Sequence, residues 1–150
     1  MSEALDIDAL IEQYVGPVFD ETEFVFAADD LATFARACGE TAPRFTDPAA
    51  PDFQASPTMP TRLQPTRRFP KGFPSIAGLG MDAGKAVQPQ APIRPGVVVT
   101  ARTHLHEIYT KTGRSGRMVF FVNRMELTDL AGSPLALADT RIVIREKPDA

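Results

Sequence analysis

Few side chains in this 150-residue sequence could do acid–base or metal chemistry, and its two histidines are the first to consider. His104 and His106 stand two residues apart in an apolar run, so both rings would project from one face of a strand. Such a pair could bind a metal or transfer a proton. Because no third ligand follows at a suitable spacing, an exposed or interface position is the favoured interpretation, and we predict no metal site.

The single cysteine restricts the chemistry further. Cys38 alone excludes an intrachain disulfide and a zinc site built from cysteines. A lone thiol fits a reducing, cytoplasmic setting. Its place at the end of an apolar helical stripe predicts a small buried side chain.

The charge balance argues against two classes of partner. Sixteen Lys and Arg face 19 Asp and Glu, which gives a net charge of -3. Binding to nucleic acid or to an anionic membrane surface requires clustered positive charge. The sequence also has no run of about 18 apolar residues, the length that could span a bilayer. One local basic cluster exists, at Arg62, Arg67, Arg68 and Lys71. It is equally compatible with phosphate binding and with solvated surface arginines.

Three long runs near the C-terminus supply the clearest structural signal. Val97 to Tyr109, Arg117 to Leu127 and Leu135 to Ile144 are rich in Val, Ile, Phe and Thr, and turn residues separate them. They predict an antiparallel meander. In the last run apolar residues alternate with charged ones, which indicates a sheet with one covered face.

The N-terminal part predicts two helices and a short strand. Spacings of three and four residues indicate a weak helix over Leu5 to Tyr14, ended by the Gly-Pro pair that follows Val15. Phe24 to Phe26 is typical of a brief strand. Asp29 to Cys38 is the one good helix, with two carboxylates at its start and a glycine after its end.

Between these parts lies a proline-rich segment. Thr41 to Gly96 holds 11 of the 14 prolines, a density that disfavours long regular structure. Because the segment also carries many apolar residues, we expect irregular chain packed against the sheet and not a solvated linker. We predict a lead over residues 1–22, a single domain over 23–147 and a tail over 148–150.

Three motifs in a fixed order resemble a known family. Gly39-Glu40-Thr41-Ala42-Pro43-Arg44-Phe45 follows the good helix, Ala55-Ser56-Pro57-Thr58-Met59-Pro60 comes next, and Pro92-Ile93-Arg94-Pro95-Gly96 opens the meander. Over about residues 15 to 146 this arrangement resembles the MaoC-like hot-dog family of R-specific enoyl-CoA hydratases and 3-hydroxyacyl dehydratases. The resemblance implies an α+β hot-dog fold, with an antiparallel sheet, one main helix and the proline-rich segment in place of the central helix.

The sequence departs from the family at the residues that do the chemistry. Active members carry Gly-Asp-x-Asn-Pro-x-His, whose Asp and His hold the water that adds to the substrate. Matching Pro43 to the motif puts Glu40 at the Asp position and Phe45 at the His position. A phenyl ring cannot transfer a proton, so we expect no catalytic residue in this chain and little activity from it alone.

The resemblance then implies the non-catalytic, N-terminal-type half of a double hot-dog dehydratase. In such halves the missing central helix widens the acyl tunnel, and the other half supplies the catalytic pair. We expect a separate catalytic hot-dog chain or a second copy as partner, and an acyl-CoA thioester as substrate, with no further cofactor. The residues expected to bind substrate are Pro57, Thr58, Met59, Arg62 and Phe73.

A second hypothesis stays open. The chain could form a homodimeric acyl-CoA thioesterase or acyl-thioester binder, with Glu40 or Asp30 as the carboxylate that directs water at the carbonyl. The acyl group, the choice between coenzyme A and an acyl carrier protein, and the size of the assembly are not determined by the sequence.

Overall fold

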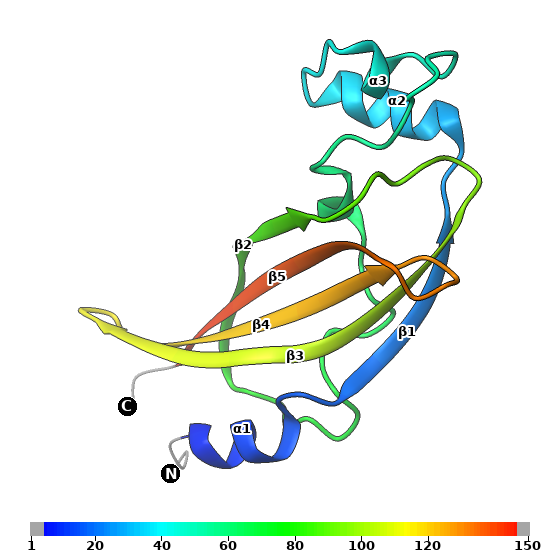
Figure 1. Cartoon of the computed structure of the whole chain (residues 1–150). Coiled ribbons are helices and arrows are strands. Elements are labelled where there is room, and N and C mark those ends of the chain that lie inside the picture. Colours follow the sequence, from blue (N-terminus) through cyan, green and yellow to red (C-terminus); the bar gives the residue numbers. More distant parts are fainter. Residues whose placement is uncertain (1–4, 147–150) are drawn as a thin grey trace.

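The computed structural model describes residues 5–146, so the tail predicted at 148–150 lies outside the described residues. The elements in chain order are the helix α1 (Ile7–Tyr14), the strand β1 (Val18–Val25), the helices α2 (Ala28–Ala37) and α3 (Pro43–Thr46), the 3-10 helix η1 (Met59–Arg62), and the strands β2 (Gly78–Pro89), β3 (Val98–Gly113), β4 (Gly116–Thr128) and β5 (Pro134–Glu146). Figure 1 shows the five strands as one curved sheet, with α2 and α3 at one end and α1 at the other.

The sheet is antiparallel throughout and has the order β1-β3-β4-β5-β2. The predicted meander is confirmed as β3, β4 and β5, which pair in sequence at the centre. Few helices accompany this sheet, so the predicted α+β class is confirmed. The Arg94-Pro95-Gly96 turn does lead into β3, and Gly96, at a φ of +75°, donates its N–H to the carbonyl of Phe26 at 2.9 Å.

The expectation that the proline-rich segment is irregular throughout is wrong in its last part, because β2 lies within it. Between Pro74 and Pro89 no proline interrupts the chain, and this gap accommodates the strand. β2 has glycines at 78, 80 and 84 and few β-branched residues, so it carries little strand signal. It pairs only with β5, at the edge of the sheet, where such residues are tolerated.

β1 also begins earlier than predicted. Its pairing with β3 starts at Val18, which places the boundary predicted at residue 22 inside a strand. The alternation of exposed and covered residues is already present there, with Asp20 buried under the proline-rich segment.

The helices begin and end near the predicted residues. Asp6 caps α1 by accepting the N–H of Ala9 at 3.1 Å, and Gly16 follows at a φ of +114°. In α2 the acidic first turn precedes an apolar face that packs on the sheet. The prediction for Cys38 is wrong: the residue is exposed, since it lies one position beyond the last turn of α2 and outside its buried face.

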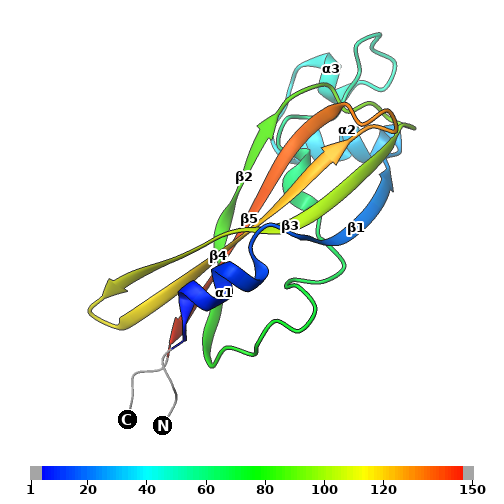
Figure 2. The same ribbon diagram turned by 60° about the horizontal axis from the view of Figure 1, so that its bottom comes forward.

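Two apolar clusters cover the same face of the sheet, here called the inner face. The α2-end cluster packs α2, η1 and the loops around them against the sheet, with Leu31, Met59 and Val99 among its most buried residues. The α1-end cluster packs α1 and residues 69–76 against the other end, around Phe121. Figure 2 shows α1 and the α2–α3 pair at opposite ends of the sheet.

The predicted absence of a long central helix is confirmed. Between α3 and β2 the single turn of η1 is the helical structure found in the described chain. Two sets of elements therefore cover the inner face. α2 and the proline-rich segment cover one end, and α1 with the rest of that segment covers the other.

Candidate functional site

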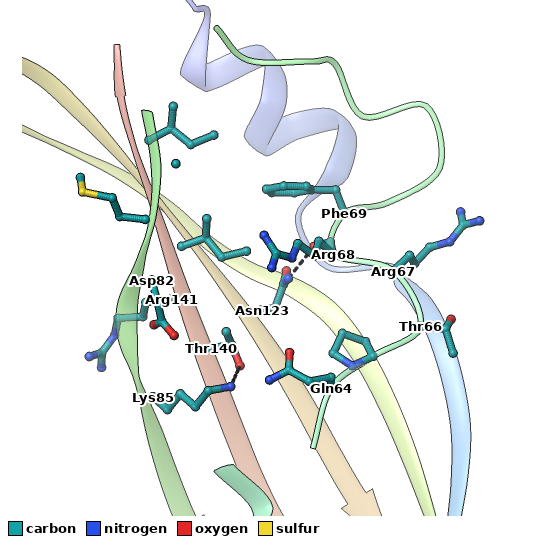
Figure 3. A pocket seen from close by; sticks show the side chains of 15 residues that line it. Gln64, Thr66, Arg67, Arg68, Phe69, Asp82, Lys85, Asn123, Thr140 and Arg141 are labelled. Atoms are coloured by element: carbon teal, nitrogen blue, oxygen red, sulfur yellow. Dashed lines mark hydrogen bonds between the residues drawn. The ribbon is translucent and has the colours of Figure 1, made fainter. Parts of the chain in front are cut away.

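A groove lies on the inner face between the proline-rich segment and strands β2 and β5. Its volume is about 740 Å³. Its walls come from the segment at 64–69, from β2 and from the inner-facing residues of β5, and Asn123 of β4 reaches it from the centre of the sheet. Figure 3 shows Gln64, Thr66 and Phe69 on one side of the space, with Lys85 and Thr140 across from them. We call this space the inner groove.

Two polar contacts hold the segment over the sheet. The buried carboxylate of Asp20 accepts the backbone N–H of Thr66 at 3.1 Å and also its hydroxyl. Asn123 donates its Nδ2–H to the carbonyl of Arg68 at 2.6 Å (Figure 3). Because both anchors come from the sheet, residues 66 to 68 are held in place without a helix. They form a fixed wall of the groove.

A β-bulge in β2 decides which of its side chains face the groove. Asp82 pairs with Ile142, but Lys85 pairs with Thr140, so two residues of β2 oppose one residue of β5 between these pairs. The extra residue reverses the alternation of side chains. Gly84, at a φ of +105°, donates its N–H to Asp82 Oδ1 at 2.8 Å and allows the bend. As a result both Asp82 and Lys85 line the groove.

One polar residue from each strand forms a row across the inner face. Asp20 pairs with Thr103, Asn123 pairs with Thr140, and Thr140 pairs with Lys85, while Thr103 lies one diagonal step from Asn123. We call these five residues the polar belt. On β4 it separates the α1-end cluster from the α2-end cluster, because Phe121 belongs to the first and Met125 to the second.

The two motif-equivalent positions lie away from the inner groove. Phe45 belongs to α3 and is 7% exposed, with the Arg44 guanidinium over its ring at 4.8 Å. Glu40 follows α2, is half-buried and donates its backbone N–H to the carbonyl of Ala35 at 3.0 Å. Neither side chain, nor that of Asp30, lines the groove.

The residues expected to bind substrate divide between the two ends of the molecule. Met59 has no exposed surface and is part of the α2-end cluster. Arg62 is exposed, with its guanidinium 5.8 Å from the ring centre of Phe34. Thr58 is exposed beside them. Pro57 lines a second, smaller pocket of about 280 Å³ between residues 54–60, 89–93 and the start of β5.

Phe73 lies at the other end, in the α1-end cluster. Its ring stacks on Phe69 at 4.7 Å and meets Phe121 edge-on at 5.7 Å. Of these aromatic residues, Phe69 is the one that reaches the inner groove. Phe73 therefore supports the groove wall from behind.

Neither histidine lines the groove, and the alternation along β3 puts His104 on the face of the sheet opposite to Thr103 and Leu105. His104 Nε2 and His106 Nδ1 are 3.3 Å apart, and a second bulge in β3 lies between Leu105 and Glu107. Burial lowers the pKa of His104; Glu126 opposes this, and His106 adds to it. Within residues 5–146 no three His, Cys, Asp or Glu side chains gather to hold a metal ion.

Sequence reasoning missed the residues that shape the groove. Asn123 is a lone amide in the apolar run of β4, and this interruption is a usable signal for a polar residue under a covered face. Lys85 gave no such signal, because its direction depends on the bulge. Of the basic cluster, Arg67 and Arg68 do line the groove.

Comparison with known proteins identifies the family. A family model described as the FAS1-like dehydratase domain region matches residues 13–138. The chain belongs to this family. Together with the structural neighbours below, the match confirms the predicted membership of the MaoC-like hot-dog dehydratases. Comparison with curated proteins gives no match.

Solved MaoC-like structures share the fold. The MaoC-like dehydratase from Phytophthora capsici has a TM-score of 0.64 at 20% identity, over 97% of this chain and 52% of that chain. This MaoC-like chain therefore spans about half the length of the Phytophthora protein.

No helix of residues 5–146 is long and apolar enough to cross a membrane.

Two further neighbours are complexes from Mycobacterium tuberculosis. The ChsH1-ChsH2 complex has a TM-score of 0.62 at 15% identity, over 87% of this chain and 85% of that chain. The C-terminally truncated HadBC (3R-hydroxyacyl-ACP dehydratase) complex has a TM-score of 0.59 at 17% identity, over 87% and 93%. At these identities the likeness shows the hot-dog fold.

Proposed function

We propose that this chain is the non-catalytic, substrate-binding subunit of a heteromeric MaoC-like enoyl-CoA hydratase or 3-hydroxyacyl-CoA dehydratase that acts on a bulky acyl thioester. In this proposal a partner hot-dog chain supplies the Asp and His that handle the water. The acyl thioester is the ligand, and no separate cofactor takes part. The cytoplasmic setting stays a prediction.

The observation that carries the proposal is the phenyl ring of Phe45 at the position of the motif's histidine. The ring is buried in α3, and hydration needs a group there that can accept and return a proton. The part of the chain that the structure describes offers no histidine near this position, since both histidines lie on β3. The chemistry must then come from another chain.

The inner groove supports a binding role. Its volume of about 740 Å³ falls within the range of about 300–1,000 Å³ that is usual for small-molecule sites. Ile142, Ile144 and Phe69 give it apolar surface for an acyl chain. A central helix would occupy the space above the sheet, so its replacement by irregular chain is consistent with a bulky acyl group.

The edge strand β2 supports a partner beside the groove. β2 has one free edge, and its outer-facing residues Leu79 and Met81 are 53% and 40% exposed. Unpaired edges with exposed apolar side chains are usually covered in the working assembly. A hot-dog chain that pairs with this edge would lie directly against the groove that β2 borders. Two structural neighbours, HadBC and ChsH1-ChsH2, are themselves complexes.

The thioesterase hypothesis has less support. It needs Glu40 or Asp30 to reach the bound thioester, and neither residue lines the inner groove.

Co-expression with a hot-dog chain that carries Gly-Asp-x-Asn-Pro-x-His tests the proposal. We expect a tag on this chain to recover both chains, and the complex to hydrate a bulky enoyl-CoA. Replacing the partner motif's His should abolish turnover, whereas Glu40→Ala in this chain is the matched control and should leave turnover within about twofold. Loss of turnover in Glu40→Ala would contradict the proposal and favour chemistry on this chain.

A further inference from the structure

Two side-chain oxygens of the polar belt, Thr103 Oγ1 and Asn123 Oδ1, are buried without a hydrogen-bond partner among residues 5–146, and only Asn123 lines the inner groove. Asp20 is satisfied by Thr66 and Thr22, and Thr140 by the Lys85 ammonium, whose Nζ lies 3.4 Å from Thr140 Oγ1. Asn123 is 4% exposed, and its Oδ1 has no hydrogen-bond partner among residues 5–146. Buried amide oxygens in native proteins are nearly always paired, so this atom needs an explanation.

The orientation of the Asn123 amide is fixed by its neighbour. The carbonyl of Arg68, at 2.6 Å, can only accept, so the amide nitrogen must point toward it. The other amide atom is then the oxygen, and it is an acceptor. Asn123 lines the inner groove, so the groove is the space from which a ligand would approach this oxygen.

Apolar surface lies beside this acceptor within the groove. Ile142 and Ile144 continue from Thr140 along β5 and line the groove, and Phe69 lines it from the segment. Figure 3 shows Asn123 between Phe69 and Thr140, at the change from the apolar to the polar part of the lining. A ligand that fills this space must combine an apolar chain with a donor placed at the belt.

We propose that Asn123 is a specificity-determining residue that recognises an oxygenated acyl chain, with a chain hydroxyl donating to Asn123 Oδ1. This inference rests on the proposed function, because it takes the inner groove to be the acyl site. A plain hydrocarbon chain would leave the buried oxygen unpaired on binding, whereas a hydroxyl at the right carbon would satisfy it.

Binding of matched fatty acids to the full chain tests the inference without catalysis. Dodecanoic acid and its hydroxy derivatives, with the hydroxyl near the head, in the middle or at the end of the chain, would displace a dansylated undecanoic acid. We expect one hydroxy isomer to bind about three- to tenfold more tightly than dodecanoic acid, as one buried hydrogen bond predicts. Ile142→Trp, which fills the groove, should weaken all the acids.

Three variants separate ligand recognition from the anchoring of Arg68. Asn123→Leu removes the acceptor and should abolish the preference for the hydroxy isomer. Asn123→Asp keeps the acceptor but loses the donor to Arg68, and should retain the preference. Thr103→Val is the control: its Oγ1 is also buried and unpartnered within the described chain, but it does not line the groove. It should leave the preference unchanged.

The outcomes distinguish the two proposals. If no acid displaces the probe, the groove does not take acyl chains, and both this inference and the proposed binding role fail. If dodecanoic acid binds but every hydroxy isomer binds more weakly, only the inference is overturned. If Asn123→Leu and Asn123→Asp weaken all acids equally, Asn123 serves as an anchor alone and the inference is again overturned. The comparison of isomers on the unaltered chain holds even if a variant does not fold.

Discussion

The two ends of the inner face are closed in different ways. At the α2 end the proline-rich segment inserts Phe53, Met59 and Leu63 into the sheet's apolar surface, and Met59 and Val99 have no exposed surface. Toward the α1 end the segment from Gln64 to Phe69 stands off the sheet, and the inner groove remains. Loss of a central helix has therefore not loosened the fold evenly: irregular chain packs closely on the sheet at the α2 end, and it leaves a ligand-sized space between residues 64–69 and strands β2 and β5.

The largest expected effect compares one residue from each end. Met59→Ala should lower the free energy of unfolding by about 3 kcal/mol, since it leaves a cavity in a fully packed cluster. Ile142→Ala should cost under about 1 kcal/mol, because Ile142 is half-buried and already faces the groove. Urea unfolding of both variants measures the difference. Equal losses would mean that the two ends are packed alike.

The next prediction concerns the edge that borders the groove. Met81→Lys should weaken association with a partner at least about tenfold, or about 1.4 kcal/mol, because a lysine on an edge strand opposes strand pairing. Val25→Lys on the opposite edge strand, β1, is the matched control, since Val25 is 61% exposed. Sedimentation or co-purification measures both. If Val25→Lys alone disrupts the complex, the partner binds the edge far from the groove.

A smaller effect is expected for His104, which follows Thr103 of the polar belt on β3 but points to the outer face of the sheet. Burial lowers the pKa of His104, so the folded chain resists a proton that the unfolded chain binds at its ordinary pKa of about 6.5. The free energy of unfolding should then fall slightly as the pH drops from about 7 to about 6. The neighbouring charges are Glu126, His106, Arg124 and Asp139.

His104→Gln should reduce this slope, as urea unfolding at the two pH values would show. An identical slope in the variant would assign the pH dependence to other groups. His106→Gln is the comparison variant, because its ring contacts His104 from the exposed side.

The smallest expected effect is none at all. The double variant Glu40→Asp with Phe45→His restores the motif's acid–base pair, but the central helix whose amides would polarise the thioester is still missing. Turnover of an enoyl-CoA by this variant should stay at background. Substantial turnover would mean that the replaced helix matters less than the two side chains.

Periodic signals predicted the centre of the molecule well. In β5 Ala138, Thr140 and Ile142 alternate with Asp139 and Arg141, which indicates one covered face, and the structure puts the first three on the inner face. The helix over α2 was equally clear. Such signals depend on neighbouring residues in one strand or helix.

The groove depends on relations that no single segment contains. The bulge after Asp82 changes the direction of Lys85, and only the register of two strand pairs, β4–β5 and β2–β5, brings Asn123 level with Thr140 and Lys85. Likewise the exposure of Cys38 depends on where the last turn of α2 stops. The motif comparison at Phe45 could be made from the sequence because it needs the residue type and not its surroundings.

Turnover of a bulky enoyl-CoA by the purified chain tests the central claim most directly. The assay would follow loss of the enoyl thioester at equal concentrations of this chain alone and of its complex with a motif-bearing hot-dog chain. We predict background rates alone and hydration by the complex. Brisk hydration by this chain without a companion would contradict the assignment of the water chemistry to a partner.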